Sequence, residues 1–117
     1  MSFKVIIAGG RGFDDYGKLA DRMDFYLQNR SAVEIVSGTA RGADKLGEKY
    51  AAERQLPVAR FPAEWNKYGR SAGYKRNTVM ADYADALVAF WDGISRGTKH
   101  MIDIAKEKDL PLRIVKY

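Results

Sequence analysis

Short apolar runs alternate along this chain with segments in which apolar residues recur at three- and four-residue spacing. That alternation is typical of βαβ units, in which a helix returns the chain between two parallel strands. The runs are rich in Val, Ile, Ala and Phe, as strands buried on both faces are. We therefore predict five strands, at residues 4–8, 34–37, 58–61, 86–90 and 113–116.

Four helices are predicted between these strands, at residues 16–28, 43–54, 73–83 and 97–108. The first has an apolar stripe, and Asp14 or Asp15 can cap its start. Val79 and Met80 of the third helix and Met101 of the fourth are expected to face the core. The four predicted helices can therefore pack on the predicted sheet through their apolar faces.

The expected fold class is α/β: a Rossmann-like three-layer sandwich with a five-stranded parallel sheet and helices on both faces. Right-handed crossovers favour the strand orders 3-2-1-4-5 and 2-1-3-4-5. We prefer 3-2-1-4-5, because it brings the glycine-bearing loops after strands 1, 2 and 4 to one carboxyl edge, where open α/β sheets bind ligands. A length of 117 residues suits a single domain over residues 1–117.

Composition narrows the functional classes. The chain has no cysteine, which excludes disulfides, thiolate metal sites and a cysteine nucleophile. We expect no bound metal, a cytoplasmic location and no membrane partner, since the apolar run at the start is too short to span a bilayer. The net charge of +5 favours an anionic partner. The basic residues are dispersed, which argues mildly against nucleic acid.

The first glycine-rich loop reads Gly9-Gly10-Arg11-Gly12-Phe13. Glycines allow a ligand to approach the backbone closely, and Arg11 offers a planar fork of donors to a phosphate. The same glycines can instead form a plain turn between strand and helix. Phe13 is accordingly either a neighbour of a bound base or a core side chain.

The second loop reads Ser37-Gly38-Thr39-Ala40-Arg41-Gly42-Ala43-Asp44 and ends in the first turn of a helix. Unpaired amide groups at a helix start bind anions, and the Ser37 and Thr39 hydroxyls can add donors. Asp44 competes with a phosphate there, so it either stabilises the helix start or contacts a ribose or base. The loop is neither a Walker motif nor a G-x-G-x-x-G fingerprint.

A third loop, Trp91-Asp92-Gly93-Ile94-Ser95-Arg96-Gly97-Thr98, again opens a helix. We expect a second anion site there, facing the first, which suits a ligand with two phosphates or with one phosphate and a ribose. Ser95 or Thr98 can instead be a simple helix cap.

Residues 62–77 form the longest stretch predicted to be irregular, and they are rich in aromatic and basic side chains. Long loops in compact domains are often functional. Trp65 can stack a base, while Arg76 and Asn77 lie close to the predicted phosphate site. The alternative is a lid that covers the sheet edge.

The segments GGRGF, VSGTARGADKLGEKYA, FPAEWNKYGRSAGYKRNTVM and VAFWDGISRGTKHMI, in this order, resemble the small bacterial and phage YspA-like proteins of the SLOG superfamily. That Rossmann-like superfamily also contains the Lonely Guy (LOG) phosphoribohydrolases and the DNA-processing Smf/DprA proteins. The resemblance covers nearly the whole chain and implies a nucleotide-related ligand, with no further cofactor. By residue match, it implies ligand contacts at Gly9, Gly10, Arg11, Ser37, Gly38, Arg41, Gly42, Asp44, Arg76, Asn77, Gly93, Ser95, Gly97 and Thr98.

LOG enzymes cleave the N-glycosidic bond of a nucleoside monophosphate with an arginine from an R-K-x-x-M-A-like helix and a glutamate from P-G-G-x-G-T-x-x-E. Here Arg76 and Met80-Ala81 match the first pattern. The second fails, because Gly93-Ile94-Ser95 stands for P-G-G and Met101 stands for the glutamate. A methionine neither stabilises an oxocarbenium ion nor activates water.

We therefore expect a nucleotide-binding domain that acts as a sensor, carrier or sequestering protein, with the base near Trp65 or Phe13. A nucleotide-processing hydrolase is the first alternative, with Arg76 stabilising negative charge and Asp44 or Asp92 as the base. Binding of single-stranded nucleic acid is the second alternative and is less favoured. Pairing through helices in relatives implies a homo-oligomer.

Overall fold

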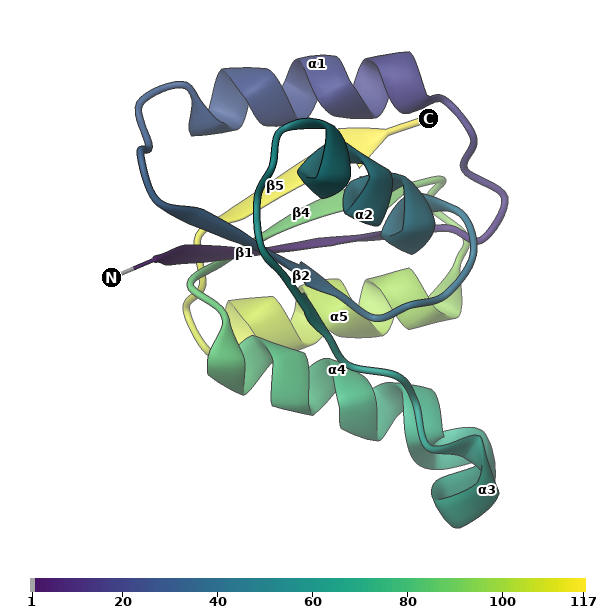
Figure 1. Cartoon of the computed structure of the whole chain (residues 1–117). Helices are drawn as coiled ribbons and strands as arrows, with labels where there is room; N and C mark the ends of the chain where they lie inside the picture. The colour runs from purple at the N-terminus through teal and green to yellow at the C-terminus, as the bar shows by residue number, and fades with distance from the viewer. Residues whose placement is uncertain (1) are drawn as a thin grey trace.

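The computed structural model describes residues 2–117 and contains one sheet of five parallel strands in the order β3-β2-β1-β4-β5 (Figure 1). The preferred order, 3-2-1-4-5, is therefore confirmed. Each predicted strand is present, with ends that differ by at most one residue. The strands are β1 (Phe3–Gly9), β2 (Val33–Ser37), β3 (Val58–Arg60), β4 (Ala86–Trp91) and β5 (Leu112–Lys116).

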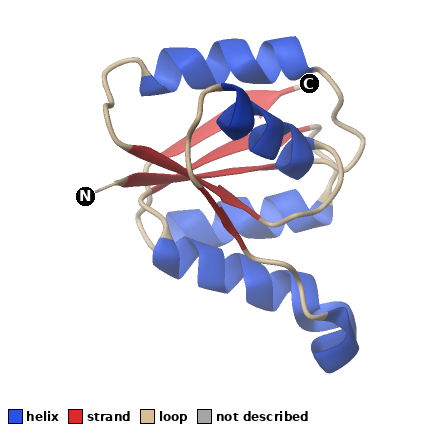
Figure 2. Cartoon of the chain, viewed as in Figure 1, coloured by secondary structure: helices blue, strands red, loops and turns tan. Residues whose placement is uncertain are grey.

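Helices cover both faces of the sheet, which makes the fold a Rossmann-like three-layer sandwich (Figure 2). One face carries α1 (Tyr16–Leu27) and α2 (Ala43–Glu53), and the other carries α4 (Ala72–Tyr83) and α5 (Arg96–Glu107). None of the helices within residues 2–117 combines the length and the apolar character that a bilayer crossing requires.

The sheet separates two hydrophobic cores, one on each face, and the central strand β1 contributes side chains to both. Val5 and Ile7 pack into the core beneath α1 and α2, while Ile6 and Ala8 pack into the core against α4 and α5. Alternate side chains of a strand point to opposite faces, so a continuous apolar run is what a strand covered on both sides needs.

The apolar stripe predicted for α1 faces the core. Leu19, Met23 and Leu27 are buried at four-residue spacing, and the Asp15 side chain accepts a hydrogen bond from the Lys18 N–H at 3.0 Å. Asp15 is therefore the cap of the two candidates considered.

Two sequence expectations are wrong. Residues 62–77 are largely helical: α3 (Trp65–Tyr68) and a 3₁₀ turn (Gly69–Ser71) lead directly into α4. Gly69, with φ of +58°, ends α3 in a conformation that favours glycine, and the polar side chains on so short a helix show no apolar period. Val79 faces away from the core, with 51% of its surface exposed, because the buried side of α4 is formed by other residues, namely Ala72, Asn77, Met80 and Ala81.

Candidate functional site

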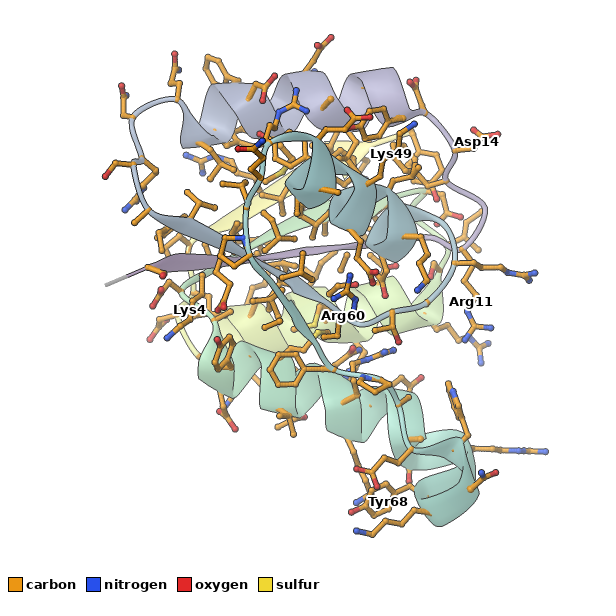
Figure 3. The ribbon with its side chains drawn as sticks, in the orientation of Figure 1. Lys4, Arg11, Asp14, Lys49, Arg60 and Tyr68 are labelled. Carbon is orange, nitrogen blue, oxygen red and sulfur yellow. The ribbon has the colours of Figure 1, made fainter. Side chains whose placement is uncertain are left out.

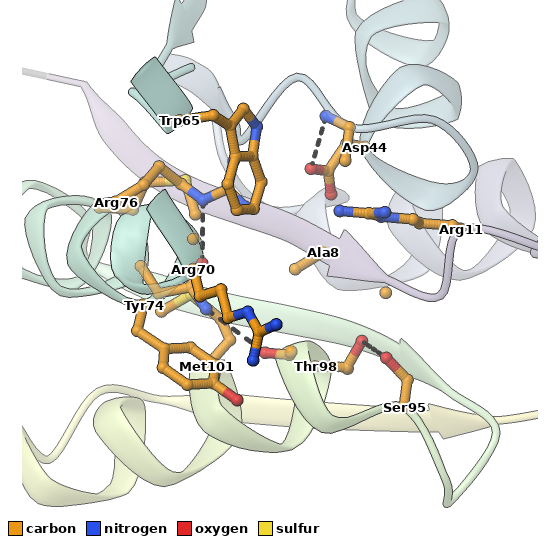
Figure 4. Close-up of a pocket in the computed structure, with 16 residues that line it drawn as sticks. Ala8, Arg11, Asp44, Trp65, Arg70, Tyr74, Arg76, Ser95, Thr98 and Met101 are labelled. Atoms are coloured by element: carbon orange, nitrogen blue, oxygen red, sulfur yellow. Dashed lines mark hydrogen bonds between the residues drawn. The ribbon is translucent and has the colours of Figure 1, made fainter. Parts of the chain in front are cut away.

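Two adjoining clefts lie where the loops after β1, β2 and β4 meet, at the carboxyl edge of the parallel sheet. The cleft with more lining residues, which we call the main cleft, has a volume of about 370 Å³. It reaches α4 and α5 and includes Ser95, Thr98 and Met101 in its lining. The side cleft, of about 480 Å³, lies against the loop after β2. Four residues line both clefts: Arg11, Ala40, Trp65 and Arg76. The clefts therefore share a wall that carries two guanidinium groups and one indole ring (Figure 4).

The glycines after β1 are required by packing. A Cβ on Gly9 would lie 2.3 Å from the Phe90 carbonyl oxygen and 2.8 Å from the Ala43 Cβ, so only glycine lets β1, β4 and α2 come this close. Gly10 N–H donates to the same Phe90 oxygen at 3.2 Å. These contacts bring the chain to Arg11, whose exposed side chain projects beyond the end of β1 (Figure 3).

The loop after β2 is held in a strained conformation against the loop after β1. Thr39 has φ of +66°, which is uncommon for a β-branched residue, and Gly42 has φ of +80°. Ala43 N–H donates to the Gly10 carbonyl at 3.2 Å, which ties the start of α2 to the first loop. The backbone between Gly38 and Arg41 forms one wall of the side cleft.

A partly buried chain of hydrogen-bonded polar side chains, which the sequence reasoning missed, supports this loop. The Ser37 hydroxyl donates to Glu48 at 2.6 Å and accepts from the Thr39 N–H at 3.1 Å. Arg60 donates to the other Glu48 oxygen at 3.1 Å. Ser37 is 1% exposed and lines neither cleft, so the prediction that its hydroxyl is free for a ligand is wrong. Its role in the structure is to hold Thr39.

Asp44 is the only acidic side chain that lines either cleft in the part of the chain described. It is 7% exposed, and one carboxylate oxygen, Oδ2, accepts from the Ala40 N–H at 3.1 Å. Burial raises the pKa of Asp44 to about 6, although the Ala40 N–H and the charges of Arg76 and Arg11 act in the opposite direction. Glu48 lies four residues further along α2, on the same helix face, and this spacing was a signal from which it could have been found.

Arg76 reaches the clefts from α4. One of its terminal nitrogens donates to the Gly38 carbonyl oxygen, and its Nε donates to the Asn77 side-chain oxygen at 3.0 Å. Burial lowers the pKa of Arg76, and the Asp44 charge works against that shift. The guanidinium is thus fixed by backbone and amide groups, with no carboxylate within ion-pair distance among residues 2–117.

The loop after β4 is organised by Asp92. Its Oδ1 accepts from the Ile94 and Ser95 N–H groups, each at 2.8 Å, and these hydrogen bonds lower the pKa of Asp92. Its exposed side chain lines neither cleft. The Ser95 and Thr98 hydroxyls lie 3.1 Å apart, and no side chain caps α5. The two hydroxyls therefore border the main cleft instead of serving as simple helix caps.

Two aromatic side chains, Trp65 and Tyr74, also line the main cleft. Trp65 is 50% exposed, and the Tyr74 ring packs against His100 in a tilted arrangement with the ring centroids 4.3 Å apart. Asn77, 6% exposed, donates to the Gly97 carbonyl at 3.3 Å and so joins α4 to the start of α5. Trp65 and Tyr74 therefore both present aromatic surface at the main cleft.

The structure brings most of the predicted ligand-binding residues to the two clefts. Those that line at least one cleft are Gly9, Arg11, Gly38, Thr39, Arg41, Asp44, Trp65, Arg76, Asn77, Ser95, Gly97 and Thr98. Those that line neither are Gly10, Phe13, Ser37, Gly42 and Gly93. Lining residues that the prediction left out include Ala40, Arg70, Gly73, Tyr74, Met80 and Met101.

Phe13 belongs to the core. It is 3% exposed, and its ring centroid lies 5.0 Å from that of Phe90 and 4.7 Å from that of Tyr117. Of its two predicted roles, the structure places it in the packing role. Trp65 is then the aromatic side chain at the clefts that the prediction assigned to the base.

Comparison with protein families gave one match. The model of the family described as YAcAr, the YspA, cpYpsA-related SLOG family, matches residues 3–68. The matched segment runs from β1 through α3 and includes the loops after β1 and β2, but not Arg76 or the loop after β4. No curated protein matches the chain.

Proposed function

Because this chain belongs to the YspA, cpYpsA-related SLOG family, we propose that it binds a nucleotide or a nucleotide-derived ligand in the paired clefts, as a sensor, carrier or sequestering protein. The observation that carries this proposal is the shared wall of the clefts. Arg11 and Arg76 supply two positive charges there, of which Arg76 is held by hydrogen bonds, and Trp65 supplies a half-exposed ring beside them. A nucleotide needs this combination, because it joins an anionic phosphate to a flat aromatic base.

Hydrogen-bond donors for the phosphate groups of such a ligand lie at the starts of two helices. The first turns of α2 and α5 present backbone N–H groups with no partner inside the helix, and both helices begin at the clefts. Arg41 lies at the outer side of the β2 loop, with its side chain exposed. An anion in the side cleft is therefore within reach of backbone amides and of more than one guanidinium group.

The base has apolar surface in the main cleft. Met80 and Met101 are both almost completely buried and form part of the lining, as does Tyr74. Asn77 and Thr98 offer polar atoms on the same wall. Apolar walls with a few fixed polar groups are typical of sites for small ligands.

The test is a binding screen by thermal shift and calorimetry with ribonucleoside mono-, di- and triphosphates and with nucleotide-sugar and cyclic forms. We expect a selective rise in melting temperature for one class, because ligands that bind only the native state stabilise it. Arg41→Ala and Arg76→Ala should each weaken binding about tenfold or more, the size of one hydrogen bond to a charged group. Arg22→Ala, which removes an equal charge from the exposed surface of α1, is the control. If both cleft variants bind every nucleotide as the wild type does, the proposed site is wrong.

A nucleotide-processing hydrolase is the second candidate, and the raised pKa of Asp44 in the same cleft as Arg76 favours it. Met101 lines this cleft, so the position of the LOG glutamate holds no carboxylate, and Asp92 lies outside the lining. Hydrolysis would therefore use Asp44. Mass spectrometry of each bound nucleotide after incubation distinguishes the two: intact ligand supports binding alone, whereas a product that disappears with Asp44→Asn supports an enzyme.

A further inference from the structure

Only one of the two oxygens of the Asp44 carboxylate accepts a hydrogen bond from the described part of the protein. Oδ2 accepts from the Ala40 N–H, and no group among residues 2–117 donates a hydrogen bond to Oδ1. No enclosed side-chain oxygen or nitrogen in this part of the chain lacks a partner, so Oδ1 is not fully enclosed, and the main cleft that Asp44 lines is the open space beside it. Asp44, a residue that is 7% exposed, thus presents one free acceptor to the cleft.

The chemistry of that acceptor limits what can occupy the space in front of it. An ionised carboxylate accepts hydrogen bonds and donates none. A phosphate oxygen placed there would meet a like charge in a poorly hydrated site, which is unfavourable. The part of the ligand that faces Asp44 must therefore carry an O–H or N–H group.

The position of Asp44 identifies which part of a nucleotide this is. Figure 4 shows Asp44 directly above the end of the Arg11 side chain and to one side of Trp65, and these two residues are a cationic and the aromatic member of the shared wall. A base stacked on Trp65 and a phosphate held by Arg11 are joined covalently by the sugar, and the sugar of a ribonucleotide carries two hydroxyl groups. Its hydroxyls are the donors that reach this place.

We propose that Asp44 accepts a hydrogen bond from a ribose hydroxyl of the ligand, and that it thereby makes the site selective for ribonucleotides over their deoxy counterparts. The proposal rests on the proposed function and goes beyond it by naming the sugar. The neighbouring loop supports it, because the Ala40 bond fixes the carboxylate orientation before any ligand arrives. Asp44 is then a specificity-determining residue whose position in the first turn of α2 serves the ligand as well as the helix.

The experiment compares each ribonucleoside 5′-diphosphate (adenosine, guanosine, cytidine, uridine) with its 2′-deoxy, 3′-deoxy and 2′,3′-dideoxy forms by calorimetry at pH 8, where the carboxylate is ionised. For wild-type protein we expect the dideoxy form to bind roughly 10- to 100-fold more weakly than the ribonucleotide, the size of one charge-assisted hydrogen bond. In Asp44→Asn the difference should shrink to about threefold or less. The amide can keep the Ala40 bond while replacing the free acceptor by an NH₂ group.

Asp21→Asn, which removes an exposed carboxylate on α1, is the matched control and should keep the wild-type preference. Equal binding of ribose and dideoxyribose forms by the wild type would overturn the role of Asp44 while leaving nucleotide binding in place. A preference that persists in Asp44→Asn, or that follows the base and ignores the sugar, would overturn it as well. If the wild type binds neither these diphosphates nor any nucleotide of the wider screen described above, the proposed function fails, and this inference fails with it.

Discussion

Replacement of Asp44 by asparagine should stabilise the ligand-free protein at alkaline pH. The substitution keeps the size and shape of a side chain that is 7% exposed, and its amide oxygen can still accept from the Ala40 N–H. The charge is the main property lost. Because that charge is buried without a direct ion pair, its removal should relieve a cost that the folded state carries only when Asp44 is ionised.

The magnitude follows from the pKa of Asp44, which burial raises from its ordinary value of 3.8 to about 6. Between these two values the folded chain holds a proton that the unfolded chain has released, so the wild type loses stability as pH rises through this interval. One pH unit corresponds to 1.36 kcal/mol, so the full loss, reached above pH 6, is about 3 kcal/mol. The asparagine variant does not suffer this loss. It should equal the wild type near pH 4 and exceed its unfolding free energy by up to about 3 kcal/mol at pH 8.

Urea denaturation of both proteins at several pH values between 4 and 8 measures this difference directly. The difference between the proteins is the useful quantity, because the other carboxylates titrate equally in both and cancel. A variant that is no more stable than the wild type at pH 8 would refute the reasoning. So would a gain that is the same at pH 4 and pH 8, since a charge effect must disappear when the wild-type carboxyl is protonated.

Two further substitutions test the framework of the site. Gly42→Ala should lower the unfolding free energy by about 1–3 kcal/mol in urea denaturation, because the residue has φ of +80° and a Cβ there would lie 2.3 Å from the Gly10 carbonyl oxygen. Gly97→Ala, where an added Cβ meets nothing within 4 Å, is the control, and an equal effect of both would contradict the argument. Glu48→Ala should cost about 1–3 kcal/mol, because the buried Ser37 hydroxyl loses its acceptor, and it should also weaken nucleotide binding through the loop that Ser37 holds. Glu48→Gln retains an acceptor and should lose less of both; if the two variants behave alike in denaturation and calorimetry, the polar chain does not support the loop.

The strands and the sheet order could be predicted because their signal is local and repeated. Runs such as the one in β1 are apolar on both faces, and the rule for right-handed crossovers leaves few ways to connect them. Helix α4 was harder. Hydrophobicity alone placed Val79 inside, whereas the structure buries Asn77, whose amide is satisfied by the Gly97 carbonyl and the His100 ring. A polar side chain can be buried when partners from another helix are present, and a single-sequence pattern does not contain those partners.

The candidate site also has features that could be predicted from the sequence and features that could not. The loops after β1, β2 and β4 were identified from glycines and from the helix starts that follow them, and the clefts lie at these loops. The pairing of Ser37 with Glu48 and the packing of Phe13 against Phe90 and Tyr117 were not identified. The residues of each pair are separated along the chain and meet only after β2, α2, β4 and β5 have assembled.

The sequence by itself determined the class of fold, the edge of the sheet at which ligands are expected, and the residue types that meet there, because period, glycine placement and chain direction are properties of neighbouring residues. Only the tertiary structure decided which of those residues face the clefts. It turned Ser37 inward toward Glu48, packed Phe13 into the core and left one oxygen of Asp44 open to the main cleft. The physical reason is that burial and the satisfaction of hydrogen bonds depend on groups brought together from distant parts of the chain.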